Sequence, residues 1–161
     1  MFSLLTWASF VLFLEVGGTD LRFPSQTFDI VFCFSSIEHF GGHAQSAKAV
    51  AEMARVVAPG GVVVITTELI VNGAPHYDDF GTGYARDFFL PDELADYVLA
   101  PARAGGLKLV DSIDLELSDG TLANALDLNS YAQCVREKPH VLLRDQSAVW
   151  TSISLVFIKP N

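Results

Sequence analysis

The chain has 161 residues, of which 50% are hydrophobic and 18% are charged, and its formal net charge is -9. This composition excludes an intrinsically disordered protein, and the length suffices for one domain with its own hydrophobic core, over residues 1–161. The 10 Lys and Arg residues form no basic run, and an acidic surface repels a phosphate backbone. We therefore expect a small-molecule partner and no nucleic acid.

The first residues are apolar. Residues 2–14 (FSLLTWASFVLFL) carry no charge, but they are fewer than the roughly 20 residues of a membrane-spanning helix. No Lys or Arg precedes Arg22, so the basic start of a signal peptide is missing. We predict no membrane span and interpret residues 10–16 as a buried strand that ends at Gly17 and Gly18; a signal segment is the alternative.

The two cysteines, Cys33 and Cys134, lie far apart and form no C-x-x-C pair, which excludes a zinc or redox motif of that type. Cys33 lies inside an apolar run, where a reduced thiol behaves as a small hydrophobic side chain. Reduced cysteines are typical of the cytoplasm, which is the localisation that we expect.

Residues 28–67 predict a strand, a helix and a second strand. Residues 28–34 (FDIVFCF) and 62–67 (VVVITT) are continuous apolar runs, typical of parallel strands buried on both faces. Between them, apolar side chains recur at helical spacing at Ala47, Val50, Ala51, Ala54 and Val57. The turn at residues 59–61 (PGG) ends this helix. Such a βαβ unit implies an α/β layered fold.

The second half of the chain is less regular. Residues 72–87 predict a long loop, in which residues 76–79 (HYDD) are a candidate acceptor lid or a solvated segment. A helix is expected from Pro91 to the Gly105-Gly106 pair. Residues 107–117 predict an edge or antiparallel strand, and residues 150–158 (WTSISLVFI) predict the last strand. A short helix is expected between residues 118 and 145.

One block resembles a known family. The block comprises Phe28-Asp29 before the apolar strand, residues 35–39 (SSIEH) after it, and residues 52–61 (EMARVVAPGG) at the end of the helix. Residues 20–69 thus resemble the class I S-adenosylmethionine-dependent methyltransferases, in particular the type 11 small-molecule branch. The resemblance implies a Rossmann-like sheet that is mostly parallel with an antiparallel last strand.

The resemblance also implies which residues hold the cofactor, S-adenosyl-L-methionine. It places Asp20 and the backbone N–H of Leu21 beside the adenine, whereas Asp20 could instead cap a turn. In an open parallel sheet ligands lie beyond the carboxyl ends of the strands. Phe34, Ser35 and Ser36 are therefore expected to line the methionine side of the cofactor.

Glu38 and His39 are expected nearest the acceptor, either as an acid/base pair or as polar residues that shape its pocket. His39 and His43 have the spacing of metal ligands on a helix, but Gly41 and Gly42 interrupt it, so we expect no metal. Ser35 lies in no G-x-S-x-G elbow, which argues against a hydrolase.

The sequence departs from the family in one respect. The glycine-rich loop after the first strand (G-x-G-x-G) and the acidic residue of the second strand are absent from it. We expect the first strand-helix units of the sheet to be missing, which would leave one edge and two faces of the sheet uncovered. Three explanations for the missing units are open: the sequence is a fragment, its start is misplaced, or the chain is a subunit completed by a second chain or by its own oligomer.

The resulting hypothesis is an enzyme that transfers a methyl group to a small molecule. The alternative is a non-catalytic, truncated remnant or partner subunit that binds the cofactor weakly or not at all. A nicotinamide-binding domain fits less well, because its own glycine fingerprint is also missing and residues 35–40 (SSIEHF) have no role in it.

Overall fold

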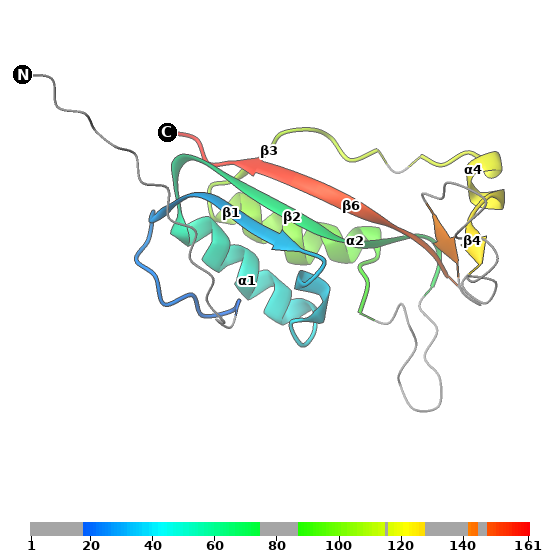
Figure 1. The fold of residues 1–161 in the computed structure, drawn as a ribbon, viewed down its shortest axis with the longest axis horizontal. Helices are drawn as coiled ribbons and strands as arrows, with labels where there is room; N and C mark the ends of the chain where they lie inside the picture. Colours follow the sequence, from blue (N-terminus) through cyan, green and yellow to red (C-terminus); the bar gives the residue numbers. More distant parts are fainter. Residues whose placement is uncertain (1–17, 75–86, 115, 128–141, 145–147) are drawn as a thin grey trace, which may run out of the picture.

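The computed structural model describes residues 18–74, 87–114, 116–127, 142–144 and 148–161 (Figure 1). The strand predicted at residues 10–16, most of the long loop and Cys134 lie outside these residues. Among the described residues, no helix is long and apolar enough to cross a bilayer.

The predicted βαβ unit is confirmed. Strand β1 (Phe28–Phe34) leads through the short helix η1 (Ile37–His39) into helix α1 (His43–Val56), which is followed by strand β2 (Val57–Gly73). The two strands pair in parallel, from Ile30 opposite Val62 to Phe34 opposite Thr66. The carboxyl end of β1 therefore lies beside Thr66 in the middle of β2, and β2 continues beyond it to Gly73 (Figure 1).

Strand β2 begins five residues before the predicted start. Val57 already pairs with Phe28, and the register then shifts before Ile30 meets Val62. The Pro59-Gly60-Gly61 turn is tied to the end of the chain, because Gly60 N–H donates to Lys159 O and Lys159 N–H donates to Gly61 O. Pairing with a distant segment thus holds this turn within the sheet.

The helical segment after the long loop starts at Pro91 and stops before Gly105, as predicted. It consists of α2 (Pro91–Leu94), η2 (Ala95–Leu99) and α3 (Ala100–Ala104) in direct succession. Glu93 caps its start, because its Oε2 accepts the Leu90 N–H at 2.9 Å.

The remaining strands complete a sheet of order β1-β2-β6-β5-β4. The last strand, β6 (Ala148–Ile158), runs antiparallel to β2, as expected for the final strand. Strand β3 (Lys108–Leu109) also pairs with β6 but is much shorter than the predicted strand over residues 107–117. Helix α4 (Asp119–Ala123) precedes the short strands β4 (Leu126–Asp127) and β5 (Leu143–Arg144).

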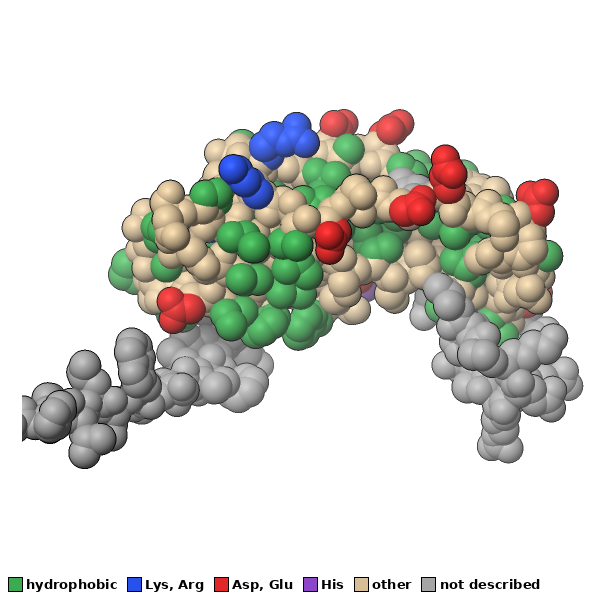
Figure 2. Space-filling model, turned by 90° about the horizontal axis from the view of Figure 1, so that it is seen from above, with side chains coloured by type: hydrophobic (Ala, Val, Ile, Leu, Met, Phe, Trp, Pro, Cys, Tyr) green, Lys and Arg blue, Asp and Glu red, His purple; other side chains and the backbone are tan. Residues whose placement is uncertain are grey.

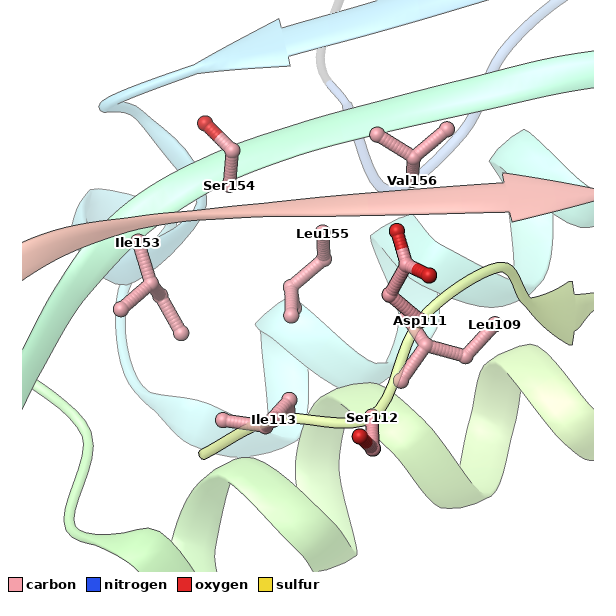
Figure 3. A pocket seen from close by; sticks show the side chains of 8 residues that line it. All are labelled: Leu109, Asp111, Ser112, Ile113, Ile153, Ser154, Leu155 and Val156. Atoms are coloured by element: carbon pink, nitrogen blue, oxygen red, sulfur yellow. The ribbon is translucent and has the colours of Figure 1, made fainter. Parts of the chain in front are cut away.

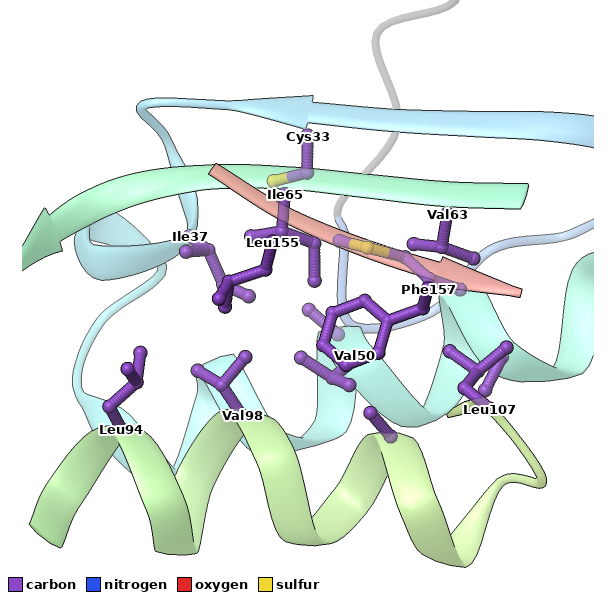
Figure 4. Close-up of a cluster of buried hydrophobic side chains, with 14 of the residues drawn as sticks. Cys33, Ile37, Val50, Val63, Ile65, Leu94, Val98, Leu107, Leu155 and Phe157 are labelled. Carbon is purple, nitrogen blue, oxygen red and sulfur yellow. The ribbon is translucent and has the colours of Figure 1, made fainter. Parts of the chain in front are cut away.

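The core lies between the helices and one face of the sheet. Cys33, Ile65 and Leu155 point from the strands toward Val50 of α1 and Val98 of η2 (Figure 4). These side chains are at least 93% buried, and burying each large apolar side chain contributes about 1.5–3 kcal/mol.

No helix in the described part of the chain covers the opposite face of the sheet. Ile30, Phe32 and Phe34 alternate along β1 and are 53%, 59% and 56% exposed, and Val156 and Ile158 of β6 are exposed on the same face. All five of these exposed side chains are apolar. Figure 2 shows hydrophobic side chains gathered in one continuous area of the surface. We call Ile30, Phe32, Phe34, Val156 and Ile158 the open apolar face.

Candidate functional site

The carboxyl end of β1 carries three of the residues predicted to bind a cofactor. Phe34 ends the strand with its ring exposed, and Ser35 turns the chain away from the sheet. Ser35 has a φ of 42°, a left-handed conformation that costs a non-glycine residue about 1–2 kcal/mol. Its N–H donates to Thr66 O at 2.9 Å and to Thr66 Oγ1 at 3.0 Å, which ties the strained turn to the middle of β2. Strain of this kind is concentrated at functional sites.

Glu38 lies buried beneath this turn, with 1% of its surface exposed. Its Oε2 accepts a hydrogen bond of 2.8 Å from Thr67 Oγ1, and Thr67 is itself fully buried in β2. A buried carboxylate needs such a donor, because leaving it without one costs several kcal/mol. The pair therefore fixes η1 on the middle of β2, next to the carboxyl end of β1.

His39 lies between two carboxylates. Its Nε2 is 3.9 Å from Glu38 Oε1, and its Nδ1 is 3.7 Å from Asp87 Oδ2. The His39 side chain is 57% exposed, so it faces solvent while both neighbours are more buried. A histidine held in this way can accept a proton from a bound molecule and share the resulting charge with the carboxylates.

The predicted adenine residues lie in the segment that packs on α1. The Asp20 side chain is 81% exposed, and its Oδ2 lies 4.0 Å from Arg22 Nε. The Leu21 N–H, in contrast, donates to Glu52 Oε2 at 2.9 Å. The Leu21 amide thus already has an acceptor within the chain, whereas the Asp20 carboxylate is open to solvent.

Arg55 organises that segment. Its guanidinium donates to Leu21 O at 2.6 Å, to Phe23 O at 2.8 Å and to both oxygens of Glu52 at 2.8 Å. The hydrogen bond from Arg55 holds the pKa of the Glu52 carboxyl below its usual range. The Glu52-x-x-Arg55 pair of the sequence block is therefore the clamp that holds residues 21–23 on α1.

Sequence reasoning placed Phe34, Ser35, Ser36, Glu38 and His39 near one another, and the structure brings them together at one strand end. It did not find Thr67 or Asp87. Thr67 stood inside an apolar run, and only its place at the carboxyl end of the second strand could have indicated it. Asp87 is the last residue of the predicted long loop, and no spacing in the sequence linked it to His39.

Cys33 lies on the core side of β1 and is a free thiol. Burial raises the pKa of Cys33 to about 11, and the nearby Glu38 carboxylate adds to this effect. Such a thiol is not an activated nucleophile. Among the described residues, no group of three or more His, Cys, Asp or Glu side chains could hold a metal ion.

Two cavities lie away from this strand end, along β3. The larger one measures about 360 Å³ and lies between α3 and β3. The smaller one measures about 250 Å³ and opens where the chain leaves β3, and its lining includes Asp111 and Ile113 together with Ile153 and Leu155 of β6 (Figure 3). Leu109 lines both cavities.

Comparison with known proteins finds one family model that matches the first part of the chain. Residues 5–65 match the methyltransferase domain family of type 11. The matched range contains β1, η1, α1 and the start of β2, together with Asp20 and all the other predicted site residues. None of the curated proteins matches the sequence.

Several solved structures are similar to this one. The cyclase SpnF is 17% identical, with 90% of this chain and 54% of that chain covered and a TM-score of 0.49. A Bacillus halodurans protein with a provisional methyltransferase assignment is 15% identical over 89% of this chain and 69% of its own, with a TM-score of 0.49. Phosphoethanolamine N-methyltransferase 2 of Haemonchus contortus, in complex with S-adenosyl-L-methionine, is 18% identical over 89% of this chain and 36% of its own, with a TM-score of 0.47.

The chain spans about half the length of SpnF and about a third of the Haemonchus contortus enzyme. All three TM-scores lie below 0.5 and all three identities lie below 25%, so no property of these proteins is carried over to this chain.

Proposed function

We propose that this chain, whose residues 5–65 match the type 11 methyltransferase domain, is a class I methyltransferase that binds S-adenosyl-L-methionine and methylates a small molecule. The observation that carries the proposal is the position of the matched segment in the fold. Its polar residues Ser35, Ser36, Glu38 and His39 come together at the carboxyl end of β1, where open parallel sheets bind their ligands.

The residues present fit part of the cofactor. The exposed Phe34 ring offers an apolar surface, the Ser36 hydroxyl offers a lone pair, and the open carboxylate of Asp20 can accept an amine. The Leu21 N–H fits less well, because Glu52 already accepts its hydrogen bond. We assign Asp20, Phe34, Ser35 and Ser36 to the cofactor, and Leu21 only if Glu52 gives up that hydrogen bond.

His39 is assigned to the acceptor, and Glu38 is assigned to the positioning of His39. When bound, the cofactor supplies an electrophilic methyl group, so the protein has to align a nucleophile and remove its proton. His39 is exposed and held between Glu38 and Asp87, so it can take that proton from a hydroxyl or an ammonium group. Glu38 is buried and positions His39 rather than touching the acceptor.

An acidic chain favours a small acceptor over a nucleic acid, because a net charge of -9 repels phosphates. We place the enzyme in the cytoplasm, for which the free thiol of Cys33 is the supporting observation.

A second candidate function is a non-catalytic subunit that keeps the fold but binds little cofactor. One observation favours it: the Leu21 amide, which the cofactor site would use, is engaged by Glu52. In that case the open apolar face is the surface on which a completing chain packs.

Isothermal titration calorimetry of the purified chain with S-adenosyl-L-methionine distinguishes the two. We expect saturable heat that is weakened by Phe34→Ala, because the ring at the strand end is lost. The matched control is Ile30→Ala, an exposed apolar residue on the same strand and face but farther from the strand end. No heat at millimolar ligand decides for the non-catalytic subunit, whereas an equal effect of the two substitutions would refute the placement of the cofactor at the end of β1.

A further inference from the structure

The cavity between α3 and β3 has an apolar floor. Leu107 and Phe157 are 3% and 2% exposed, and Leu99 and Leu109 are half-buried beside them. Its volume of about 360 Å³ lies within the range of roughly 300–1,000 Å³ that is typical of small-ligand pockets. The cavity is remote from the carboxyl end of β1, so it plays no part in the function proposed above.

Two cations line the same cavity. Arg103 stands near the end of α3 and Lys108 begins β3, and both side chains are exposed. Within the part of the chain that the structure describes, neither has an ion pair or a side-chain hydrogen bond. Arg55, Arg144 and Lys159, in contrast, each donate to carboxylate or carbonyl oxygens.

The pairing of β3 adds a backbone donor on this side. Val110 N–H donates to Val156 O, so it points toward β6. The direction of successive N–H groups alternates along an antiparallel strand, so the Leu109 N–H points to the other edge. Among the described strands, β3 pairs only with β6, which leaves this edge of Leu109 open.

The two cations and the apolar floor together favour one chemical class of ligand. In a chain with a net charge of -9, two neighbouring cations that have no partner among the described residues attract an anion. The acidic residue nearest in sequence, Asp111, lines the adjoining cavity instead (Figure 3). An apolar floor beside these cations favours a ligand that carries a hydrocarbon tail. We propose that this cavity binds a medium-chain fatty-acid anion, with the carboxylate at Arg103 and Lys108 and the tail over Leu107 and Phe157.

Three probes separate the contribution of the ligand's charge from that of its hydrocarbon tail. Sodium decanoate has the charge and the tail, decanol has only the tail, and acetate has only the charge. We expect calorimetry on the whole chain to show saturable binding of decanoate, with decanol and acetate weaker by about tenfold or more. In the ¹H–¹⁵N spectrum, decanoate should shift the amide resonance of Leu109. Equal binding of decanoate and decanol would overturn the proposal.

Matched variants locate the site. The double variant Arg103→Gln/Lys108→Gln is expected to weaken decanoate binding about tenfold, which corresponds to about 1.4 kcal/mol. Both side chains are exposed, so an unchanged urea midpoint should show that the variant folds. Lys48→Gln removes an exposed cation of α1 and should change nothing.

Phe32→Ser tests the most obvious competing site, the open apolar face, and should leave decanoate binding intact. Binding that persists in the double variant, or that disappears in Phe32→Ser, would show that decanoate adheres to the open apolar face and would refute the assignment.

Discussion

Replacing Thr67 by Val tests how the buried carboxylate of Glu38 is held. The substitution keeps the volume of the side chain but removes the hydroxyl that donates to Glu38 Oε2 at 2.8 Å. A hydrogen bond to a charged group contributes about 1.5–3 kcal/mol, and Glu38 is too buried to recover it from water. We expect Thr67→Val to lower the free energy of unfolding by about 2 kcal/mol, measured by urea unfolding with circular dichroism.

The size of this loss should depend on the charge of Glu38. In a Glu38→Gln background the same bond joins two neutral groups, so Thr67→Val should cost only about 0.5–1.5 kcal/mol. Thr66→Val is the matched control, because Thr66 is the neighbouring residue on the other face and Ser35 N–H keeps its bond to Thr66 O. An equal cost for Thr67→Val and Thr66→Val, or an equal cost in both backgrounds, would refute the reasoning.

Two further predictions concern the strained turn and the clamp on α1. Ser35→Gly should raise the free energy of unfolding by about 0.5–1 kcal/mol in the same urea assay, because glycine adopts the φ of 42° without strain. Ser36→Gly should lower it, because Ser36 Oγ donates to Phe34 O at 2.6 Å; a gain in both variants would contradict the assignment of strain to Ser35. Arg55 holds the pKa of Glu52 in the folded chain below the usual 4.5. The stability that the ionised Glu52 carboxylate contributes is therefore present above pH 4.5, and it is lost as the pH falls through the lowered pKa of the folded state. Between about pH 6 and about pH 3, the wild-type chain should therefore lose more stability than Arg55→Gln, and parallel pH profiles would exclude the clamp.

The local pattern of the sequence was enough to predict the central unit. Apolar residues at helical spacing between two β-branched runs predicted α1 within one or two residues of its ends, and the parallel pairing of β1 with β2 followed from the βαβ order. The same order predicted that Ser35, Ser36, Glu38 and His39 lie at a ligand-binding strand end.

The structural features that the local sequence pattern did not predict depend on contacts between distant segments of the chain. The Pro59-Gly60-Gly61 turn belongs to β2 because Lys159 pairs with it, and no local feature of the turn predicts that partner. The alternation over residues 107–117 suggested a long strand, but β3 ends at Leu109 because the chain then diverges from β6 around a cavity. Asp87 reaches His39 only through the tertiary fold.

The open apolar face makes protein concentration a variable in every measurement on this chain. Strand β1 contains neither Lys nor Pro, the residues that commonly prevent an edge strand from pairing with another molecule. Association through Phe32 and Phe34 would bind the folded state selectively, and it would therefore raise the apparent unfolding temperature as the protein is concentrated. A dilution series consequently reports how much of the measured stability belongs to a single chain and how much is contributed by its neighbours.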